Sequence, residues 1–220
     1  MTSPFRIGTS ADESLWGDGE NNFFLGLAGD DYMEGLAGSD TAVYQGNRNE
    51  YDVSASYGKF QTLWAFVTDQ VEGRDGSYDS LYEVERLQFA DGVLAVDVEG
   101  NAGIAYQLYQ AAFDRKPDMP GLKHQIEAMD DGMNYLTISK NFVESAEFKS
   151  LYGENPTDLE FVTALYRNVL QREPEAKGLA DHLAGIEQGM SREQLLFNFA
   201  TSSENKLNLW PDIQDGIWLG

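Results

Sequence analysis

Four oxygen-bearing side chains recur at nine-residue intervals near the N-terminus: Glu13, Asn22, Asp31 and Asp40. Carboxylate and amide oxygens are ligands of hard cations, and Ca²⁺ takes six to eight such oxygens from side chains, backbone carbonyls and water. A fixed interval between acids also predicts a repeated backbone unit that brings these groups together. The chemistry indicated by this pattern is therefore cation binding.

Each of these residues ends a glycine-bearing turn. Position one of the nine-residue unit is glycine in all four copies, namely Gly8, Gly17, Gly26 and Gly35. Glycine permits tight, partly left-handed turns that a side chain would obstruct, and such turns leave carbonyl oxygens pointing inward. Position eight is apolar, with Leu15, Phe24, Met33 and Ala42. The three residues after each turn are therefore expected to form a short strand with one inward side chain.

The repeat resembles the calcium-binding nonapeptide G-G-x-G-x-D-x-U-x of RTX-type hemolysins, although position two is Leu, Asp or Thr here. The resemblance implies a beta-roll in which Asp31 faces the turn 8–13 and Asp40 faces the turn 17–22. One or two calcium ions are expected, with plain metal-free turns as the alternative. The predicted ligands are Asn22, Asp31 and Asp40, with turn carbonyls from Gly17, Gly26, Ala28, Gly35 and Ala37.

Composition limits the partners of the chain. The 220 residues include 37 acidic and 15 basic side chains, a formal net charge of −22, which disfavours nucleic acid and anionic membranes. No cysteine is present, so disulfides and thiolate metal sites are excluded. The sequence shows neither an N-terminal export signal nor a membrane-spanning segment. Resemblance to exported calcium-repeat proteins nevertheless implies an extracellular or cell-surface location, reached without an N-terminal signal peptide.

The segment from about 40 to 98 is predicted to form an antiparallel meander that caps the roll, because β-favouring runs alternate with turn residues. The runs are 41–46, 50–57, 60–69 and 83–90. The acids Asp69, Asp75 and Asp79 could hold another ion, but a solvated loop is the favoured interpretation.

After residue 101 the apolar period becomes that of helices. Two stripes are expected in the core: Tyr106, Tyr109 and Phe113, and Phe161, Leu165 and Val169. The segment 108-LYQAAFDRKPDMPGL-122 recurs as 165-LYRNVLQREPEAKGL-179, at an offset of 57 residues. We therefore predict an α+β protein. Its domains are a calcium roll with an antiparallel β cap at 1–100 and an all-α bundle at 101–220, made of two tandem three-helix units at about 101–155 and 156–210.

This helical half resembles the DUF4214 family, whose pattern is L-Y-x-x-x-L-x-R-x-P-D-x-x-G-L followed by F-x-x-S-x-E. The resemblance implies association with the cell surface or with glycans, and the helical half is expected to supply that interface. Arg115 and Arg172 are predicted to make structural salt bridges in preference to binding a ligand. The candidate partners are Asp118 or Glu175, three residues after each arginine, and Glu147 or Glu204.

Catalysis is left open but disfavoured, because common nucleophile, zinc-protease and phosphate-loop motifs are absent. His124 and His182 fall out of register in the repeat and are expected on helix surfaces. The aromatic set Trp16, Phe23, Tyr32, Tyr44, Trp64, Trp210 and Trp218 could stack on sugars, but core burial is favoured for most of it. The C-terminal segment 206–220 is expected to dock on the bundle or to act as an export signal.

The function predicted from the sequence is calcium binding with attachment to cell-surface polysaccharide. The alternatives are an enzyme or enzyme accessory acting on extracellular polysaccharide, and a structural surface-layer or secretion module that self-associates with calcium. Oligomeric state is left open.

Overall fold

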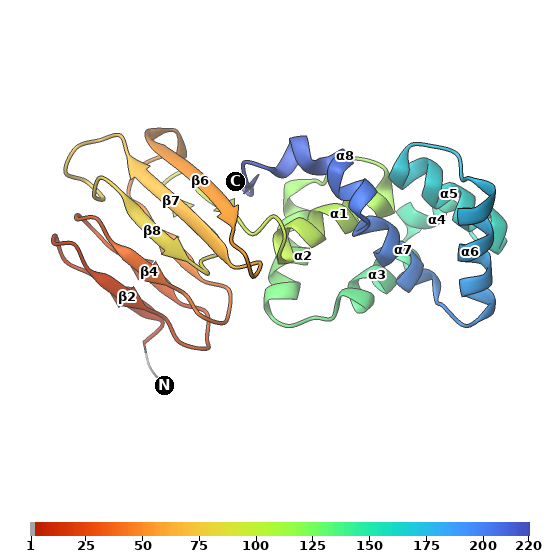
Figure 1. The fold of residues 1–220 in the computed structure, drawn as a ribbon, viewed down its shortest axis with the longest axis horizontal. Coiled ribbons are helices and arrows are strands. Elements are labelled where there is room, and N and C mark those ends of the chain that lie inside the picture. Colours follow the sequence, from red (N-terminus) through yellow and green to blue (C-terminus); the bar gives the residue numbers. More distant parts are fainter. Residues whose placement is uncertain (1–2) are drawn as a thin grey trace. The chain divides into compact units, whose positions relative to one another are not determined.

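The computed structural model describes residues 3–220, which form two compact units (Figure 1). The first contains the described residues up to Ala102 together with Gln214–Gly220, and the second contains Gly103–Ile213. Strands make up the first unit and helices the second, so the predicted α+β fold is confirmed.

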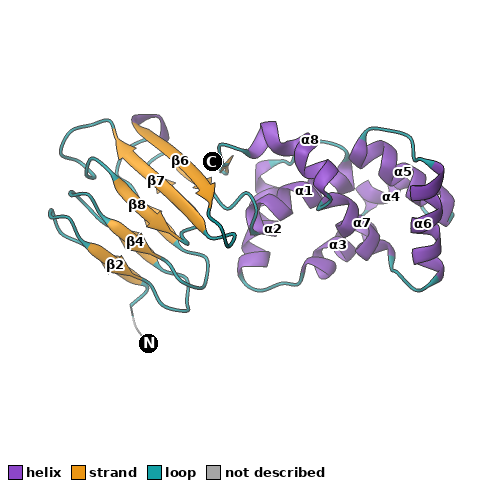
Figure 2. Ribbon diagram, in the orientation of Figure 1, coloured by secondary structure: helices purple, strands orange, loops and turns teal. Residues whose placement is uncertain are grey.

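Eleven short strands lie in the described part of the first unit (Figure 2). They are β1 (Phe5–Ile7), β2 (Ser14–Trp16), β3 (Phe23–Leu25), β4 (Tyr32–Glu34), β5 (Thr41–Val43), β6 (Tyr51–Tyr57), β7 (Leu63–Asp69), β8 (Asp79–Tyr82), β9 (Arg86–Phe89), β10 (Gly92–Ala95) and β11 (Ile217–Trp218). The repeats place their strands alternately in two sheets, ordered β1-β3-β5-β9-β10-β11 and β2-β4-β8-β7-β6. Parallel pairing of β1 with β3, β3 with β5 and β2 with β4 gives the predicted beta-roll.

The core of the roll lies between the two sheets. A three-residue strand turns only its middle side chain inward, and the position-eight residues Phe24, Met33 and Ala42 are accordingly buried. Leu81 and Leu87 from the later strands join the same cluster. The predicted inward positions are therefore confirmed.

Most of the aromatic side chains expected in the core are not buried. Of the set Trp16, Phe23, Tyr32, Tyr44, Trp64, Trp210 and Trp218, only Tyr44 is buried. Within the repeats the reason is the strand alternation, because positions seven and nine flank the inward position eight and point to the outer face. Phe23 and Tyr32 occupy position seven, and Trp16 occupies position nine. The prediction of core burial is wrong for these side chains.

The residues after the repeats extend both sheets. A short 3-10 helix (Arg48–Glu50) leads into β6, after which β6, β7 and β8 pair antiparallel and β8 also pairs in parallel with β4. In the other sheet β9 pairs in parallel with β5 and antiparallel with β10. The predicted antiparallel cap is present, and each of its parts continues one sheet of the roll. The prediction is wrong for the run 41–46, because β5 pairs in parallel with β3 and β9.

The last strand changes the expected path of the C-terminus. Ile217 and Trp218 pair with Ala95 and Leu94 of β10, and Gln214–Gly220 belongs to the β unit. The expectation that the segment 206–220 docks on the helical bundle holds for 206–213, which belong to the helical unit. It is wrong for 214–220, because an open sheet edge offers backbone groups that these residues can pair with. The use of this segment as an export signal stays a prediction.

The described part of the second unit is formed by eight helices. They are α1 (Asn101–Phe113, which starts just before the unit), α2 (Met119–Asp130), α3 (Tyr135–Glu144), α4 (Ala146–Tyr152), α5 (Asp158–Leu170), α6 (Ala176–Glu187), α7 (Arg192–Ala200) and α8 (Ser203–Ile213). Each repeat therefore has four helices, one more than predicted. The extra helices arise because the serine of S-x-E starts a new helix: Ser145 Oγ accepts from the Phe148 N–H, and Ser202 Oγ accepts from the Asn205 N–H.

The predicted helical stripes form the core of this unit. All their members are buried except Phe113, which is half-buried. His124 is exposed as predicted, whereas His182 is half-buried against the rings of Tyr166 and Phe199. None of the helices that the structure describes combines the length and the apolarity needed to cross a membrane.

Arg115 and Arg172 occupy equivalent places after α1 and α5. Arg115 Nε lies 2.7 Å from Glu147 Oε1, and Arg172 Nε lies 2.6 Å from Glu204 Oε1. Each also pairs with the acid three residues ahead and lies over a tyrosine of the preceding helix. Those partners are Asp118 and Glu175, and Tyr109 and Tyr166. The salt bridges predicted for both arginines are confirmed.

Candidate metal centre

The turns of the roll stack in two columns, and position-six side chains bridge successive turns. In one column the Glu13 N–H donates to Asp31 Oδ1 at 3.0 Å. In the other the Asn22 N–H donates to Asp40 Oδ1 at 2.8 Å. Each aspartate therefore faces the turn two units before it, as the sequence predicts.

The second oxygen of each aspartate has no partner. Asp31 and Asp40 are 2% and 0% exposed, and their Oδ2 atoms are buried without a hydrogen-bond donor. Such an oxygen is costly unless a cation or a donor meets it. A Cβ placed on Gly26 would overlap Asp31 Oδ2, and one on Gly35 would crowd Asp40 Oδ2. Glycine at these two positions keeps the space beside the carboxylates open.

Backbone carbonyls line the same columns. The Gly26 carbonyl lies against Gly8, the Gly35 carbonyl against Gly17, and the Glu83 carbonyl against Gly35. Carboxylate and carbonyl oxygens together are the donor set that Ca²⁺ prefers. No cluster of three or more His, Cys, Asp or Glu side chains able to hold a metal occurs in residues 3–220, so backbone carbonyls must supply much of the coordination. The residues present fit calcium on these terms.

Burial opposes ionisation of these acids when no cation is bound. It raises the pKa of Asp40 from 3.8 to about 7. Burial also raises the pKa of Asp31, and the nearby charge of Glu13 adds to the effect. A divalent cation in the column reverses this penalty because an opposite charge favours the ionised carboxylate.

Position two shows why the repeat pattern has glycine there. Leu27 and Leu36 have φ angles of 70° and 73°, in the left-handed region. That conformation costs an L-residue about 1–2 kcal/mol. The chain thus adopts the turn of the repeat even where a side chain strains it.

Two acids outside the repeats lengthen the columns. The Asp31 N–H donates to Asp79 Oδ1 at 3.0 Å, and the Asp40 N–H donates to Glu85 Oε2 at 2.8 Å. Burial raises the pKa of Asp79 to about 7 and that of Glu85 to about 8. These two side chains therefore belong to the same buried acidic columns as the repeat aspartates.

Sequence reasoning missed Glu85 and placed Asp79 in a loop that could hold another ion but was expected to be solvated. The two pairs are 48 and 45 residues apart, because the β6–β7 hairpin interrupts the nine-residue interval. One signal was available: 79-DSLY-82 carries the same acid and inward apolar residue as 31-DYME-34, and the two segments pair in register.

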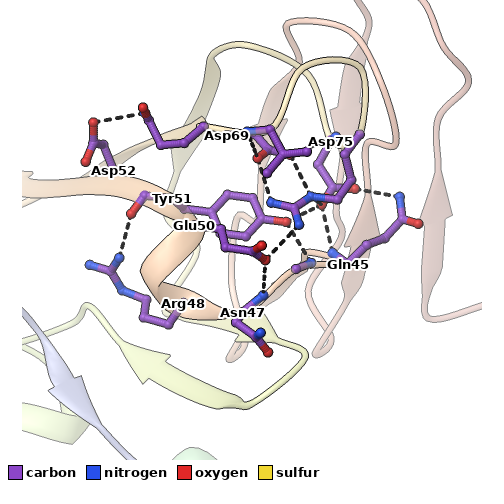
Figure 3. Close-up of polar contacts among 12 residues, drawn as sticks. Gln45, Asn47, Arg48, Glu50, Tyr51, Asp52, Asp69 and Asp75 are labelled. Carbon is purple, nitrogen blue, oxygen red and sulfur yellow. Dashed lines mark hydrogen bonds and ion pairs between the residues drawn. The ribbon is translucent and has the colours of Figure 1, made fainter.

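A third group of acids at the cap has its own cation. Figure 3 shows Glu50, Asp69 and Asp75 gathered around Tyr51. Arg74 Nη1 lies 2.8 Å from Glu50 Oε2, and its Nη2 lies 2.6 Å from Asp69 Oδ1. The guanidinium also lies 4.8 Å from the centre of the Tyr51 ring. This arginine offsets part of the negative charge of the cluster, and the solvated loop favoured from the sequence is wrong for Asp69 and Asp75, and also for the buried Asp79.

The predicted ligands occupy the columns to different degrees. Asn22, Asp31, Asp40, Gly26 and Gly35 are buried there. Gly17 and Ala28 are half-buried, and Ala37 is exposed. The assignment of all eight as calcium ligands stays a prediction.

Comparison with known families matches both halves of the chain. Residues 7–42 match the profile described as RTX calcium-binding nonapeptide repeat (4 copies). This chain contains RTX repeats. Residues 139–209 match the profile described as Domain of unknown function (DUF4214). Both resemblances drawn from the sequence are confirmed, and calcium is confirmed as the ion of the RTX repeats.

Comparisons with individual proteins and solved structures give no further information on function. No curated protein matches the chain significantly. The crystal structure of extracellular lipase LipA from Serratia marcescens is similar over 43% of this chain and 18% of the lipase chain, with 16% identity and a TM-score of 0.19. The chain thus spans under a fifth of the length of that lipase.

Proposed function

We propose that this protein is secreted, is ordered by Ca²⁺ outside the cell and attaches there to cell-surface polysaccharide. The observation that carries the proposal is the pair of buried, unpartnered oxygens of Asp31 and Asp40 beside open glycine positions. A roll built in this way lacks part of its stabilisation until a cation supplies it.

The dependence on calcium supports the export part of the proposal. A chain with a net charge of −22 repels itself, and low cytosolic calcium leaves its RTX repeats unfolded enough to pass through a secretion channel. Ca²⁺ that binds only the folded form stabilises it by an amount that grows with the ratio of ion concentration to dissociation constant. Folding is thereby coupled to arrival in a calcium-rich medium.

Polysaccharide is the proposed surface ligand because the charge of the chain disfavours the main alternatives. Nucleic acid and anionic lipid would meet 37 acidic against 15 basic side chains. The resemblance to DUF4214 implies association with the cell surface, and polysaccharide is a ligand found there.

Calcium titration by calorimetry, with thermal unfolding of the same samples, tests the proposal. We expect the parent to bind Ca²⁺ and to melt at a higher temperature with it, and the Asp31→Ala/Asp40→Ala variant to lose both effects. Asp30→Ala, at an exposed neighbouring position, is the matched control and should keep them. A parent that binds no Ca²⁺ at millimolar concentration contradicts the proposal. Retention of the calcium-loaded chain on polysaccharide then tests attachment.

A further inference from the structure

The outer face of the sheet β2-β4-β8-β7-β6 carries aromatic side chains interspersed with serines and a glutamate. Strand register places one row across the five strands, reading Trp16, Glu34, Tyr82, Trp64 and Ser56. Each strand sends its neighbouring side chains into the core, so the members of this row point outward. The row crosses four strand gaps, a span of about 19 Å at the usual strand separation.

A second row lies beside the first, two residues along each strand. It reads Ser14, Tyr32, Ser80, Phe66 and Ser54. Along both rows the side chain opposite each ring on a neighbouring strand is a serine, a glutamate or another ring. Hydrogen-bonding groups therefore lie beside the rings in both rows, and Tyr82 and Trp64 form the one directly opposed pair of rings.

Five of the rings form one continuous surface, and Trp16 lies beyond Glu34 on the edge strand β2. Trp64 lies at the centre, with ring centroids 4.7 Å from Tyr82, 6.2 Å from Phe66 and 6.4 Å from Tyr32. Tyr78 extends the group, 5.7 Å from Phe66. Trp16 and Tyr78, at the two ends, are 56% and 47% exposed, and the rings between them are half-exposed. We name this group of six rings the aromatic face.

Several features distinguish the aromatic face from an ordinary apolar contact patch. Ser80 lies between Tyr32 and Phe66, and the carboxylate of Glu34 accepts a hydrogen bond from the Tyr32 hydroxyl at 2.9 Å. The five strands contain no lysine or arginine, and their outward charges on this face are the acids Glu34 and Asp52. Aromatic rings with a few well-positioned polar groups are typical of small-ligand binding sites. The negative charge of the face disfavours an anionic ligand.

We infer that the aromatic face binds a neutral glycan chain. Sugar rings would lie with their C–H faces on Trp64 and its neighbours, and their hydroxyls would hydrogen-bond to the serines and to Glu34. The inference rests on the proposed attachment to polysaccharide and moves the binding surface from the helical half, where the sequence places it, to the β unit. It also accounts for the exposure of Trp16, Tyr32 and Trp64, three rings for which the sequence favours burial.

The test uses the calcium-loaded full chain and its variants Trp64→Ala and Trp16→Ala. Trp210→Ala is the matched control, because Trp210 is also an exposed tryptophan (43%) but lies in the helical unit. The probes are dextran, a mixed-linkage β-glucan and xyloglucan as neutral chains, with alginate as the anionic chain. Affinity gel electrophoresis gives dissociation constants, and circular dichroism with calcium calorimetry reports folding.

We expect the parent to bind at least one neutral probe and Trp64→Ala to weaken that binding by about tenfold, the equivalent of one aromatic stacking contact. Trp16→Ala, at the edge, should weaken it less and Trp210→Ala should leave it unchanged, while all variants keep the calcium affinity of the parent. Should Trp64→Ala fold poorly, the decrease in Trp16→Ala alone decides the test.

Three results would overturn the inference. Neutral binding that survives Trp64→Ala and Trp16→Ala but is lost in Trp210→Ala would place the interface on the helices and leave the proposed function standing. Binding to alginate alone would reject a neutral ligand while keeping attachment to polysaccharide. Failure to bind any of the four probes would contradict both the inference and the proposed attachment.

Discussion

Replacing Asp40 by asparagine separates the cost of burying its charge from the contribution of its hydrogen bond. Asparagine keeps an oxygen that can accept from the Asn22 N–H, but it carries no charge to desolvate. In the parent, burial raises the pKa of Asp40 from 3.8 to about 7. Between these two pKa values, Asp40 is protonated in the folded protein and ionised in the unfolded protein. The free energy of unfolding therefore falls as the pH rises through this range.

The size of the effect follows from those two values. Each tenfold change in the protonation equilibrium is worth about 1.4 kcal/mol, so ionised Asp40 opposes folding by about 4 kcal/mol at about pH 8. At about pH 5 Asp40 is protonated in most of the folded protein, and its penalty on folding decreases to about 2 kcal/mol. In chelator, Asp40→Asn should therefore exceed the stability of the parent by more at pH 8 than at pH 5. In saturating Ca²⁺ the order should reverse, because the variant lacks the charged ligand.

Urea unfolding in chelator and in Ca²⁺, at the two pH values, measures both differences. Asp30→Asn is the control, since Asp30 is exposed and accepts hydrogen bonds from Ser77, so its removal should give no gain. The reasoning is refuted if Asp40→Asn is no more stable than the parent in chelator at pH 8, or if it keeps the full stabilisation by Ca²⁺.

Three further outcomes are expected. Leu36→Gly should stabilise the protein by about 1 kcal/mol in urea unfolding, because it relieves a left-handed φ at a half-exposed side chain; a loss of stability would show that the leucine packs usefully. Arg74→Ala should cost about 3 kcal/mol in the same assay, since it leaves the buried Asp69 without its cation, and a change below about 1 kcal/mol would contradict that role. The calcium-free parent should melt at a lower temperature as pH rises from about 5 to about 8, because the raised pKa values of Asp79 and Glu85 favour their protonated forms in the folded state; a flat profile in differential scanning calorimetry would contradict this.

Local patterns in the chain predicted much of the fold. The recurrence of glycine, acid and apolar residue at nine-residue intervals predicted both the roll and the inward side chains such as Phe24 and Met33, because each coil depends only on its own turn and its neighbours. The 57-residue repeat predicted the helical unit and the salt bridges of Arg115 and Arg172 for a similar reason. In both cases the determining contacts recur at a constant separation in the sequence.

Features that depend on long-range pairing escaped the sequence patterns. The fourth helix of each repeat, which begins at the serine of the F-x-x-S-x-E motif, was not predicted, although the capping role of Ser145 was available as a signal. The period of two within each strand was a signal for the outward direction of Trp16 and Tyr32, although burial was predicted. Their inclusion in one aromatic face required the register of five strands.

The sequence by itself determined the kind of site, an oxygen-rich turn that suits calcium, because glycine φ angles and carboxylate chemistry are local properties. Only the tertiary structure decided that Asp79 and Glu85 extend the acidic columns, that Arg74 supplies a cation at the cap, and that the C-terminus pairs with β10. These contacts join segments up to about 120 residues apart. Their partners are the sheet edges without a paired strand and the buried charges without a counterion that are left after the local coils have formed.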